Sequence, residues 1–512
     1  MRARALMVLG TASNAGKSIT AAALCRIFAD DGYDVAPFKA QNMSLNAAVT
    51  PDGREIGRAQ AVQAECARRA AESDMNPVLL KPSGERRAQV VLNGRVWRDV
   101  DAWDYHTHRT RELFPQVVAA YERLASRCDL VVLEGAGSPA EINLRAGDIV
   151  NMRMADAADA ACLLVADIDR GGALAAITGT LALLLPHERD RVRAFAFTRF
   201  RGDPALLAPA VRMLEERTGA PCAGVIPWID DLGVDEEDGY LAPPPPRRWP
   251  DGDGVHRLLR IAAIAYPHVA NATDLDALGS EPSVALRRAM HARDLDGADV
   301  VVLPGSKETV ADVQWLRANA FGAAIVRHAA NRPVIGICGG MQMLGRRIDD
   351  PDGVESGGSA VGLGLLPIDT TLASVKTTTR VRGAVADAFA GVLGHGAAFE
   401  GYEIHLGVTT RFDGVPFARV RGRDGVERDD GAVDASGRVT GTYVHGIFDD
   451  DAFRHAAVDA LRARCGLAPA ERRSAWRAQR EARYDRLAAI VRGALDVPLL
   501  ARCAGLAPRV PA

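Results

Sequence analysis

The chain has 512 residues, with 62 lysines and arginines against 65 aspartates and glutamates, and a formal net charge of −3. This balance gives no reason to expect a nucleic-acid or membrane partner through bulk electrostatics, and no uninterrupted apolar stretch is long enough to span a bilayer. Eight scattered cysteines without paired spacing indicate reduced thiols. We therefore expect a cytoplasmic protein, and chemistry on small molecules stays open.

The length predicts about two to four domains, because a typical domain has roughly 100–200 residues. In the first half, short apolar runs end in Gly, Asp or Glu and precede helical patterns. This arrangement indicates a parallel sheet that helices bury on both faces, and we assign it to a first α/β domain at residues 1–242. The runs are Ala5–Leu9, Asp34–Phe38, Leu130–Leu133, Cys162–Ala166 and Arg193–Thr198.

The first apolar run leads into a glycine-rich loop, and a helical stretch follows at Ile19–Ala29. Backbone N–H groups of such a loop can face phosphates, Lys17 adds a positive charge, and the Ser18 hydroxyl can bind Mg²⁺. A chance Gly-Lys-Ser turn is the alternative, but the flanking strand and helix argue against it. The residues expected to bind a nucleotide are Gly10, Thr11, Asn14, Gly16, Lys17 and Ser18.

A magnesium ion on nucleotide phosphates usually needs a carboxylate as well. Glu134 is the candidate, because it ends the apolar run Leu130–Leu133 and so projects at the carboxyl edge of the sheet, where α/β proteins bind ligands. The alternative is a carboxylate that only caps the next turn. Asp167 and Asp169 end another run and are weaker candidates, which we interpret as structural or substrate-orienting.

A proline run within Leu241–Gly254 cannot continue a helix or a central strand, and it favours an extended spacer. We place a linker at 243–256. A second series of apolar runs, each followed by a loop rich in Gly, Pro or Ser, then predicts a second α/β domain at 257–450. These runs are Leu259–Ala265, Val300–Leu303 and Val334–Ile337.

The C-terminal segment 451–512 has a helical, arginine- and alanine-rich pattern, with apolar residues at three-to-four spacing in Ala452–Cys465 and Ala470–Leu495. We expect these helices to pack on the second domain.

Cys338 lies two residues after Gly336 and two before Gly340, directly after the apolar run Val334–Ile337. A nucleophile elbow needs small residues at these two positions, because the strand turns sharply into a helix there and presents the side chain at the helix N-terminus. The helix dipole lowers the pKa of a thiol in this place. A lone buried cysteine is usually a small hydrophobe, but the flanking glycines favour a catalytic nucleophile.

The general base is expected from a distant part of the chain. His445 ends an apolar run about a hundred residues downstream, and no other histidine has so clear a strand-end setting. A lone histidine is more often structural, so the residues alone leave this assignment open. The backbone amides of Gly305, in the loop after Val300–Leu303, and of Gly339 are the candidates for an oxyanion hole.

The loop between Gly10 and Gly16 has five residues instead of the usual four, and this longer form resembles the dethiobiotin-synthetase-like branch of the phosphate-loop proteins. Nearly the whole chain resembles the cobyric acid synthase family. Besides the phosphate loop, the resemblance rests on Phe38–Asn46, Gly53–Glu65, Met75–Pro82, Leu133–Leu144, Asp167–Gly172, Phe200–Asp203, Leu303–Lys307 and Gly441–Phe448.

The resemblance implies a synthetase domain joined to a class I glutamine amidotransferase-like domain, with Cys338 and His445 as the glutaminase pair. It also implies ATP and Mg²⁺, a corrinoid and glutamine as substrates, and amidation of the b, d, e and g carboxylates of adenosylcobyrinic a,c-diamide. Other glutamine amidotransferases carry a glutamate two residues after the histidine, whereas Ile447 occupies that position here. We therefore expect a Cys–His dyad. Thr198 replaces an expected Asn and carries no functional inference.

Two alternatives remain. Cobyrinic acid a,c-diamide synthase has the same two domain types, and the stretches within Phe38–Asn46 and Met75–Pro82 argue for the cobyric acid synthase family instead. A non-catalytic, nucleotide-switched binding protein is the other, and the Cys338 elbow with His445 argues against it. The sequence leaves open whether the protein is a monomer or a homodimer.

Overall fold

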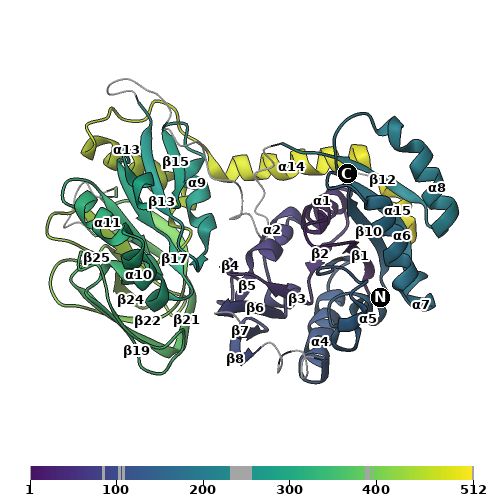
Figure 1. Ribbon diagram of the computed structural model, residues 1–512, viewed down its shortest axis with the longest axis horizontal. Helices are drawn as coiled ribbons and strands as arrows, with labels where there is room; N and C mark the ends of the chain where they lie inside the picture. The colour runs from purple at the N-terminus through teal and green to yellow at the C-terminus, as the bar shows by residue number, and fades with distance from the viewer. Residues whose placement is uncertain are drawn as a thin grey trace.

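The computed structural model describes residues 2–83, 87–101, 105, 110–230, 249, 257–386, 393–394 and 396–509. It has two lobes, an N-terminal domain and a C-terminal domain, and the long helix α14 (Trp476–Ala494) runs from one to the other (Figure 1). Of the predicted linker 243–256, only Trp249 lies within the described residues. No helix in the described part of the chain has the length and apolar character of a membrane span.

The N-terminal domain is built on a six-stranded sheet in the order β12-β11-β10-β1-β9-β2, with all neighbours parallel. All five predicted runs are strands of this sheet, and β12 is an additional edge strand. The strands are β1 (Arg4–Gly10), β2 (Val35–Phe38), β9 (Leu130–Glu134), β10 (Ala161–Asp167), β11 (Val192–Phe200) and β12 (Cys222–Pro227).

Helices cover both faces of this sheet, as the apolar runs predicted, and each face has its own apolar cluster. Helix α1 belongs to one face, whereas α4, α5 and α6 belong to the other. The helices of this domain are α1 (Lys17–Asp30), α2 (Arg58–Cys66), α4 (Phe114–Ala125), α5 (Met152–Ala158), α6 (Ala173–Leu183), α7 (Pro186–Arg189) and α8 (Ala208–Thr218).

Two small sheets between β2 and α4 lie on the side of the N-terminal domain that faces the other lobe (Figure 1). One is four-stranded, in the order β3-β6-β7-β8, and the other is a hairpin of β4 and β5. Their strands are β3 (Gln41–Met43), β4 (Ala47–Val49), β5 (Glu55–Gly57), β6 (Val78–Ser83), β7 (Arg87–Leu92) and β8 (Arg95–Asp101). Strand β4 of these sheets contacts the long strands β21 and β22 of the C-terminal domain described below.

The C-terminal domain has a second six-stranded sheet, in the order β15-β13-β16-β18-β26-β25, that is parallel except at β25. The three predicted runs form its central strands β13, β16 and β18. Its strands are β13 (Leu259–Ile264), β15 (Val284–Ala289), β16 (Val300–Leu303), β18 (Val334–Ile337), β25 (Ala432–Val433) and β26 (Val439–Thr442). Its helices include α9 (Asp276–Gly279), α10 (Thr309–Ala318), α11 (Phe321–Ala329) and α12 (Gly339–Leu344).

A further, mostly antiparallel sheet packs beside it in the order β20-β19-β21-β23-β24, and β22 pairs along β21. Its two long strands carry side chains to the N-terminal domain. The strands are β19 (Arg347–Asp350), β20 (Gly358–Val361), β21 (Ile368–Val385), β22 (Ala398–Arg411), β23 (Ala418–Arg421) and β24 (Glu427–Asp430). A short antiparallel pair of strands, β14 (Val269–Ala270) and β17 (Gly305–Ser306), lies beside Cys338.

The expected docking of the C-terminal helices on the second domain is correct for α13 (Asp451–Arg464) but wrong for α14 and α15 (Val497–Cys503). Apolar side chains of α13, and Trp476 at the start of α14, join the core of the C-terminal domain, whereas the other buried apolar side chains of α14 and those of α15 join the cluster around α1. Arg26 of α1 is 1% exposed and pairs with Glu481 and Asp485 of α14. Helical spacing shows that a face is apolar but not which core it covers, which explains the error.

Candidate active sites

Cys338 lies in a strained turn between β18 and α12, with φ 51° and ψ −112°. A Cβ added to Gly336 would lie 2.6 Å from the backbone nitrogen of Met341, and one added to Gly340 would overlap the carbonyl oxygen of Leu303. Neither position has room for a side chain. The strand–turn–helix geometry is therefore the one that the glycine spacing around Cys338 predicted.

The His445 imidazole is held by Asp274, whose Oδ2 lies 2.6 Å from Nδ1, while Asp274 Oδ1 accepts a hydrogen bond from the Gly446 amide at 2.9 Å. Both His445 and Asp274 are 2% exposed. Burial alone would lower the pKa of His445. The charges of Asp274 and Cys338, and hydrogen bonds to both, outweigh burial and raise this pKa to about 10. The structure thus brings Cys338, His445 and Asp274 together.

The expected Cys–His dyad is therefore incomplete, because Asp274 supplies the carboxylate that is missing at Ile447. Asp274 lies on the short 3₁₀ segment Ala272–Leu275, 171 residues before His445 in the chain. No local pattern in the sequence marks this aspartate as a partner of the histidine. Only the packing of this segment against the end of β26 reveals it.

A second histidine near the site is not a competing base. His405 stacks on Tyr443 at 3.8 Å between ring centroids, and its Nδ1 lies 2.9 Å from the carbonyl oxygen of Gly407. Burial is the main cause that lowers the pKa of His405 to about 3. It is therefore neutral at physiological pH, which leaves His445 as the titrating imidazole beside Cys338.

Gly305 and Gly339, the predicted oxyanion donors, lie next to this pair. A Cβ added to Gly305 would be 3.1 Å from Cε1 of His445, and one added to Gly339 would be 2.7 Å from the backbone nitrogen of Ser306. Gly305 lines the pocket that contains Cys338 and His445. The loop after β16 thus packs directly on the start of α12, and the oxyanion role of the two amides stays a prediction.

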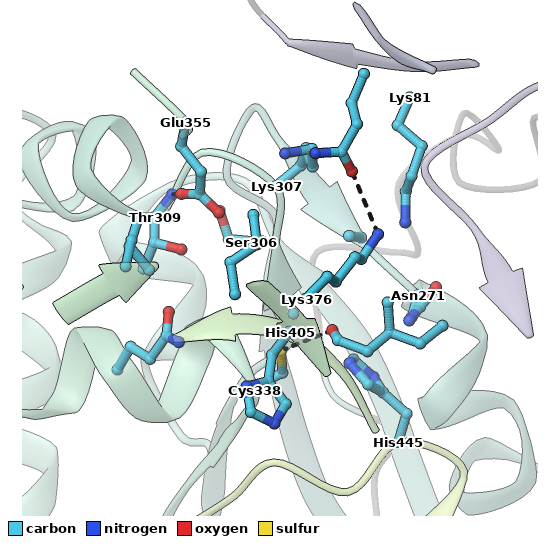
Figure 2. A pocket seen from close by; sticks show the side chains of 17 residues that line it. Lys81, Asn271, Ser306, Lys307, Thr309, Cys338, Glu355, Lys376, His405 and His445 are labelled. Atoms are coloured by element: carbon cyan, nitrogen blue, oxygen red, sulfur yellow. Dashed lines mark hydrogen bonds between the residues drawn. The ribbon is translucent and has the colours of Figure 1, made fainter. Parts of the chain in front are cut away.

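Both domains contribute to the wall of this pocket (Figure 2). Lys81 and Gln89 come from β6 and β7 of the N-terminal domain, whereas Lys307, Glu355 and Lys376 come from the C-terminal domain. Sequence reasoning did not identify any of these five residues as part of the site. Lys81 and Lys307 lie in stretches that carry the family resemblance, Met75–Pro82 and Leu303–Lys307, but nothing in the sequence assigns them to this pocket. The meeting of the five residues depends on how the two domains pack.

The phosphate loop ends at Gly16, which has φ 88° and precedes the first turn of α1. Lys17 Nζ donates to the carbonyl oxygens of Ala12 at 2.9 Å and Gly137 at 3.0 Å. Thr198 Oγ1 donates to the Ala15 carbonyl oxygen at 2.9 Å, and its side chain contacts the space beside Gly16. Thr198 therefore supports the loop, a role that the sequence did not suggest.

A second pocket contains most of the predicted nucleotide-binding residues. Asn14, Gly16, Lys17 and Ser18 line it together with Glu134. The structure places Gly10 at the end of β1 and Thr11 just after it, where the Thr11 amide donates to the Val165 carbonyl oxygen at 3.0 Å. These two residues begin the loop but are not among those that line the pocket.

Glu134 is a buried part of this second pocket and not merely a turn cap. Its Oε1 accepts hydrogen bonds from Ser18 Oγ at 2.7 Å and from Lys39 Nζ at 3.0 Å, and Gln63 donates to its other oxygen. Burial raises the pKa of Glu134, but the Lys39 charge and the three hydrogen bonds outweigh burial and lower it. Glu134 therefore stays ionised beside Ser18.

The weaker candidates Asp167 and Asp169 lie apart from this lining. Asp167 Oδ2 is 3.3 Å from Arg199 Nη1, and Asp169 Oδ1 is 3.1 Å from Arg201 Nε. Asp167 Oδ1 also accepts a hydrogen bond from the Asp169 amide at 2.9 Å. These contacts agree with the structural interpretation made from the sequence.

Residues 6–240 match a family model described as the CobQ/CobB/MinD/ParA nucleotide binding domain, and residues 260–453 match the CobB/CobQ-like glutamine amidotransferase domain. A cobyric acid synthase from Moorella thermoacetica is 48% identical over 510 residues, which is 98% of each chain. The chain belongs to the cobyric acid synthase family. Cobyric acid synthases from Yersinia enterocolitica and Salmonella typhimurium are 48% and 47% identical and cover 96% of this chain, and 96% and 97% of their own.

Membership of the cobyric acid synthase family confirms the fold class predicted from the sequence, an N-terminal phosphate-loop domain followed by a C-terminal amidotransferase domain. The chain is accordingly a glutamine amidotransferase with a nucleotide-binding domain, in a family that acts in cobalamin biosynthesis. The cobyric acid synthase similarity spans both domains in one alignment. The two pockets therefore belong to a single family architecture.

Proposed function

We propose that the chain amidates the b, d, e and g carboxylates of adenosylcobyrinic a,c-diamide to give cobyric acid, with ammonia from glutamine and energy from ATP. We place this activity in the cytoplasm. The observation that carries the proposal is the meeting of Cys338, His445 and Asp274 in a pocket whose wall includes Lys81 and Gln89 of the nucleotide-binding domain. A glutaminase site that borders a synthetase domain suits an enzyme that transfers ammonia.

The glutaminase half uses Cys338 as the nucleophile. Its thiolate attacks the side-chain amide carbon of glutamine, a C–S bond forms, and the C–N bond breaks as His445 protonates the departing ammonia. Water then hydrolyses the thioester to glutamate and restores the thiol. Asp274 keeps Nδ1 of His445 engaged at 2.6 Å, so that Nε2 is the nitrogen available to Cys338.

The synthetase half must activate a carboxylate, because oxide is a poor leaving group. The γ-phosphate of ATP is transferred to a carboxylate oxygen of the corrinoid, and ammonia then attacks the acyl phosphate and displaces phosphate. Lys17 and the N–H groups of the loop and of α1 supply positive potential at the phosphates. Lys17 is 7% exposed and is already oriented by the Ala12 and Gly137 carbonyl oxygens.

The residues of the second pocket fit a magnesium ion on the nucleotide. The Ser18 hydroxyl and the Glu134 carboxylate are hard oxygen donors 2.7 Å apart, the donor type that Mg²⁺ prefers alongside phosphate oxygens and water. When bound, the ion would neutralise charge on the transferring phosphoryl group. Lys39 holds the same Glu134 oxygen that Ser18 contacts, and so fixes the carboxylate at the pocket edge.

Mass spectrometry of cobyrinic a,c-diamide incubated with enzyme, ATP, Mg²⁺ and glutamine tests the proposal. We expect stepwise gain of up to four amides; Cys338→Ala loses this gain with glutamine and recovers it with ammonium, because only the ammonia supply is removed. An unchanged diamide, with cobyrinic acid amidated instead, would assign the activity of the a,c-diamide synthase. No turnover of glutamine by the wild type would favour a binding protein.

A further inference from the structure

A buried charge cluster joins the two domains beside the Cys338 pocket. Glu55 of β5 lies between two lysines, with Oε1 2.8 Å from Lys81 Nζ and Oε2 2.6 Å from Lys376 Nζ. The side chains of Glu55, Lys81 and Lys376 are 1%, 5% and 9% exposed. Lys376 Nζ also donates to Gln89 Oε1 at 3.3 Å. A carboxylate of one domain thus binds an ammonium group of the other out of contact with bulk water.

This cluster forms the wall of the glutaminase pocket on the side of the N-terminal domain. Lys81, Gln89 and Lys376 line the same pocket as Cys338 and His445, and Figure 2 shows Lys81 and Lys376 reaching into it from different strands. Around the cluster, an apolar group from both domains excludes water; its members are Ala47, Val49, Leu79, Val91 and Ile404, with Tyr402 packed against them.

Strand β4, which carries Ala47 and Val49 of this apolar group, also contacts residues close to Asp274 and His445. The Ala47 amide donates to Asn271 Oδ1 at 2.8 Å, and the Ala272 amide donates to Asn46 Oδ1 at 3.3 Å. Tyr402 donates to the Ala47 carbonyl oxygen at 3.2 Å and stacks on His445, with 5.5 Å between the ring centroids. The N-terminal domain therefore contacts the segment that precedes Asp274 as well as the pocket wall.

The lining of the pocket carries three lysines, and Glu55 contacts two of them, Lys81 and Lys376. Lys81, Lys307 and Lys376 line it with a single glutamate, Glu355, whose pKa burial raises to about 7. Burial, and then repulsion by Lys81 and Lys307, lower the pKa of Lys376 to about 8 although Glu55 opposes this shift. The lysines also lower the pKa of Glu55 to about 2, against the effect of burial, so Glu55 and Lys376 form an ion pair at neutral pH.

We propose that the Glu55–Lys376 ion pair couples the two sites by holding the N-terminal domain against the glutaminase pocket, so that ammonia released there reaches the synthetase domain. The inference rests on the proposed function and names a positioning residue within it. Lys376 does not line the nucleotide pocket, and no hydrogen bond among the described residues joins it to Cys338. Its removal therefore affects the use of ammonia and not the chemistry at either end.

The test compares Lys376→Met with the wild type and measures corrinoid amide formed per glutamate released. We expect this ratio to fall by about fivefold or more, while amidation supported by added ammonium stays within about twofold, because the synthetase site is intact. Arg380→Met is the matched control. Arg380 lies on the same strand and donates to the Val49 carbonyl oxygen at 3.0 Å, but it lines a different cavity, so its ratio should match the wild type.

A ratio in Lys376→Met equal to that of the wild type would overturn the inference, as would an equal loss in Arg380→Met, which would indicate general loosening of the interface. Glu55→Gln is a second variant for the case in which Lys376→Met does not fold, and it should lower the same ratio because it breaks the same pair. Wild-type enzyme that fails to amidate the corrinoid even with ammonium would instead refute the proposed function.

Discussion

At the scale of single residues, Asp274 is the part of the glutaminase site that the sequence did not reveal. Replacing it by Asn keeps the shape but removes the negative charge that raises the pKa of His445. We expect glutaminase turnover to fall on the order of 100-fold, while amidation with added ammonium is retained. If glutamine hydrolysis by Asp274→Asn equals that of the wild type, the carboxylate has no part in positioning His445.

The Asp274→Asn variant should also change the pH at which His445 loses its proton. Because the folded pKa of His445 is raised to about 10, its imidazole stays protonated through neutral pH and loses the proton as the pH rises through that value. Asp274→Asn lowers this pKa, so the loss moves to lower pH. An NMR titration of the His445 ring between pH 6 and 11 should show a midpoint near 10 in the wild type and a lower midpoint in the variant; an unchanged midpoint would contradict the role of Asp274.

The role of a residue can be predicted from sequence when the residues that define its site lie next to it in the chain. Cys338 and Lys17 were found because their glycine neighbours lie within a few positions, and the structure shows the tight turns that those glycines permit. Asp274, Lys81 and Lys376 could not be found, because each gains its partner through a contact between distant segments. Side chains that meet only through tertiary packing leave no periodic or spacing signal.

At the scale of elements, the nucleophile elbow depends on the absence of side chains at its glycines. In Gly340→Ala the new Cβ would overlap the Leu303 carbonyl oxygen, and backbone cannot move aside as a flexible side chain can. We expect glutaminase activity to fall on the order of 100-fold, because the turn that aims Cys338 is displaced. Gly493→Ala is the control, since its Cβ meets nothing within 4 Å; equal activity in both variants would contradict this account.

Apolar runs predicted most parallel strands of the two six-stranded sheets, because such strands are buried on both faces and form continuous apolar segments. They did not predict the parallel strands β12, β15 and β26. The small strands β3 to β8 lack this signal, since they are short and partly polar. Helix α14 was predicted as a helix but assigned to the wrong domain. Apolar runs therefore predict the central strands of the two six-stranded sheets. The elements between the domains, which complete the glutaminase pocket, are fixed by contacts between the domains and have no such signal.

At the scale of the whole molecule, the C-terminal helices tie the two domains into one unit. Chain termination after Arg477 would remove α15 and nearly all of α14 but keep Leu467, Ser474 and Trp476, which belong to the C-terminal domain. It would uncover the part of the apolar cluster on α1 that the two helices cover, and leave Arg26 without Glu481 and Asp485. A lost apolar face destabilises a domain strongly, and among the described residues Arg26 would keep only its ion pair with Asp30, at 3.8 Å. We therefore expect the N-terminal domain to unfold at least about 5 °C lower, while the C-terminal domain keeps its own core.

Calorimetry of the truncated chain checks this expectation, because unfolding of the two domains should separate into two transitions. A chain terminated after Arg509 keeps every contact that the structure describes and is the control. Amidation with ammonium should fall in the shorter chain together with the stability of the N-terminal domain. A single transition at the wild-type temperature would show that α14 only spans the gap between the domains, and that the N-terminal core is complete without it.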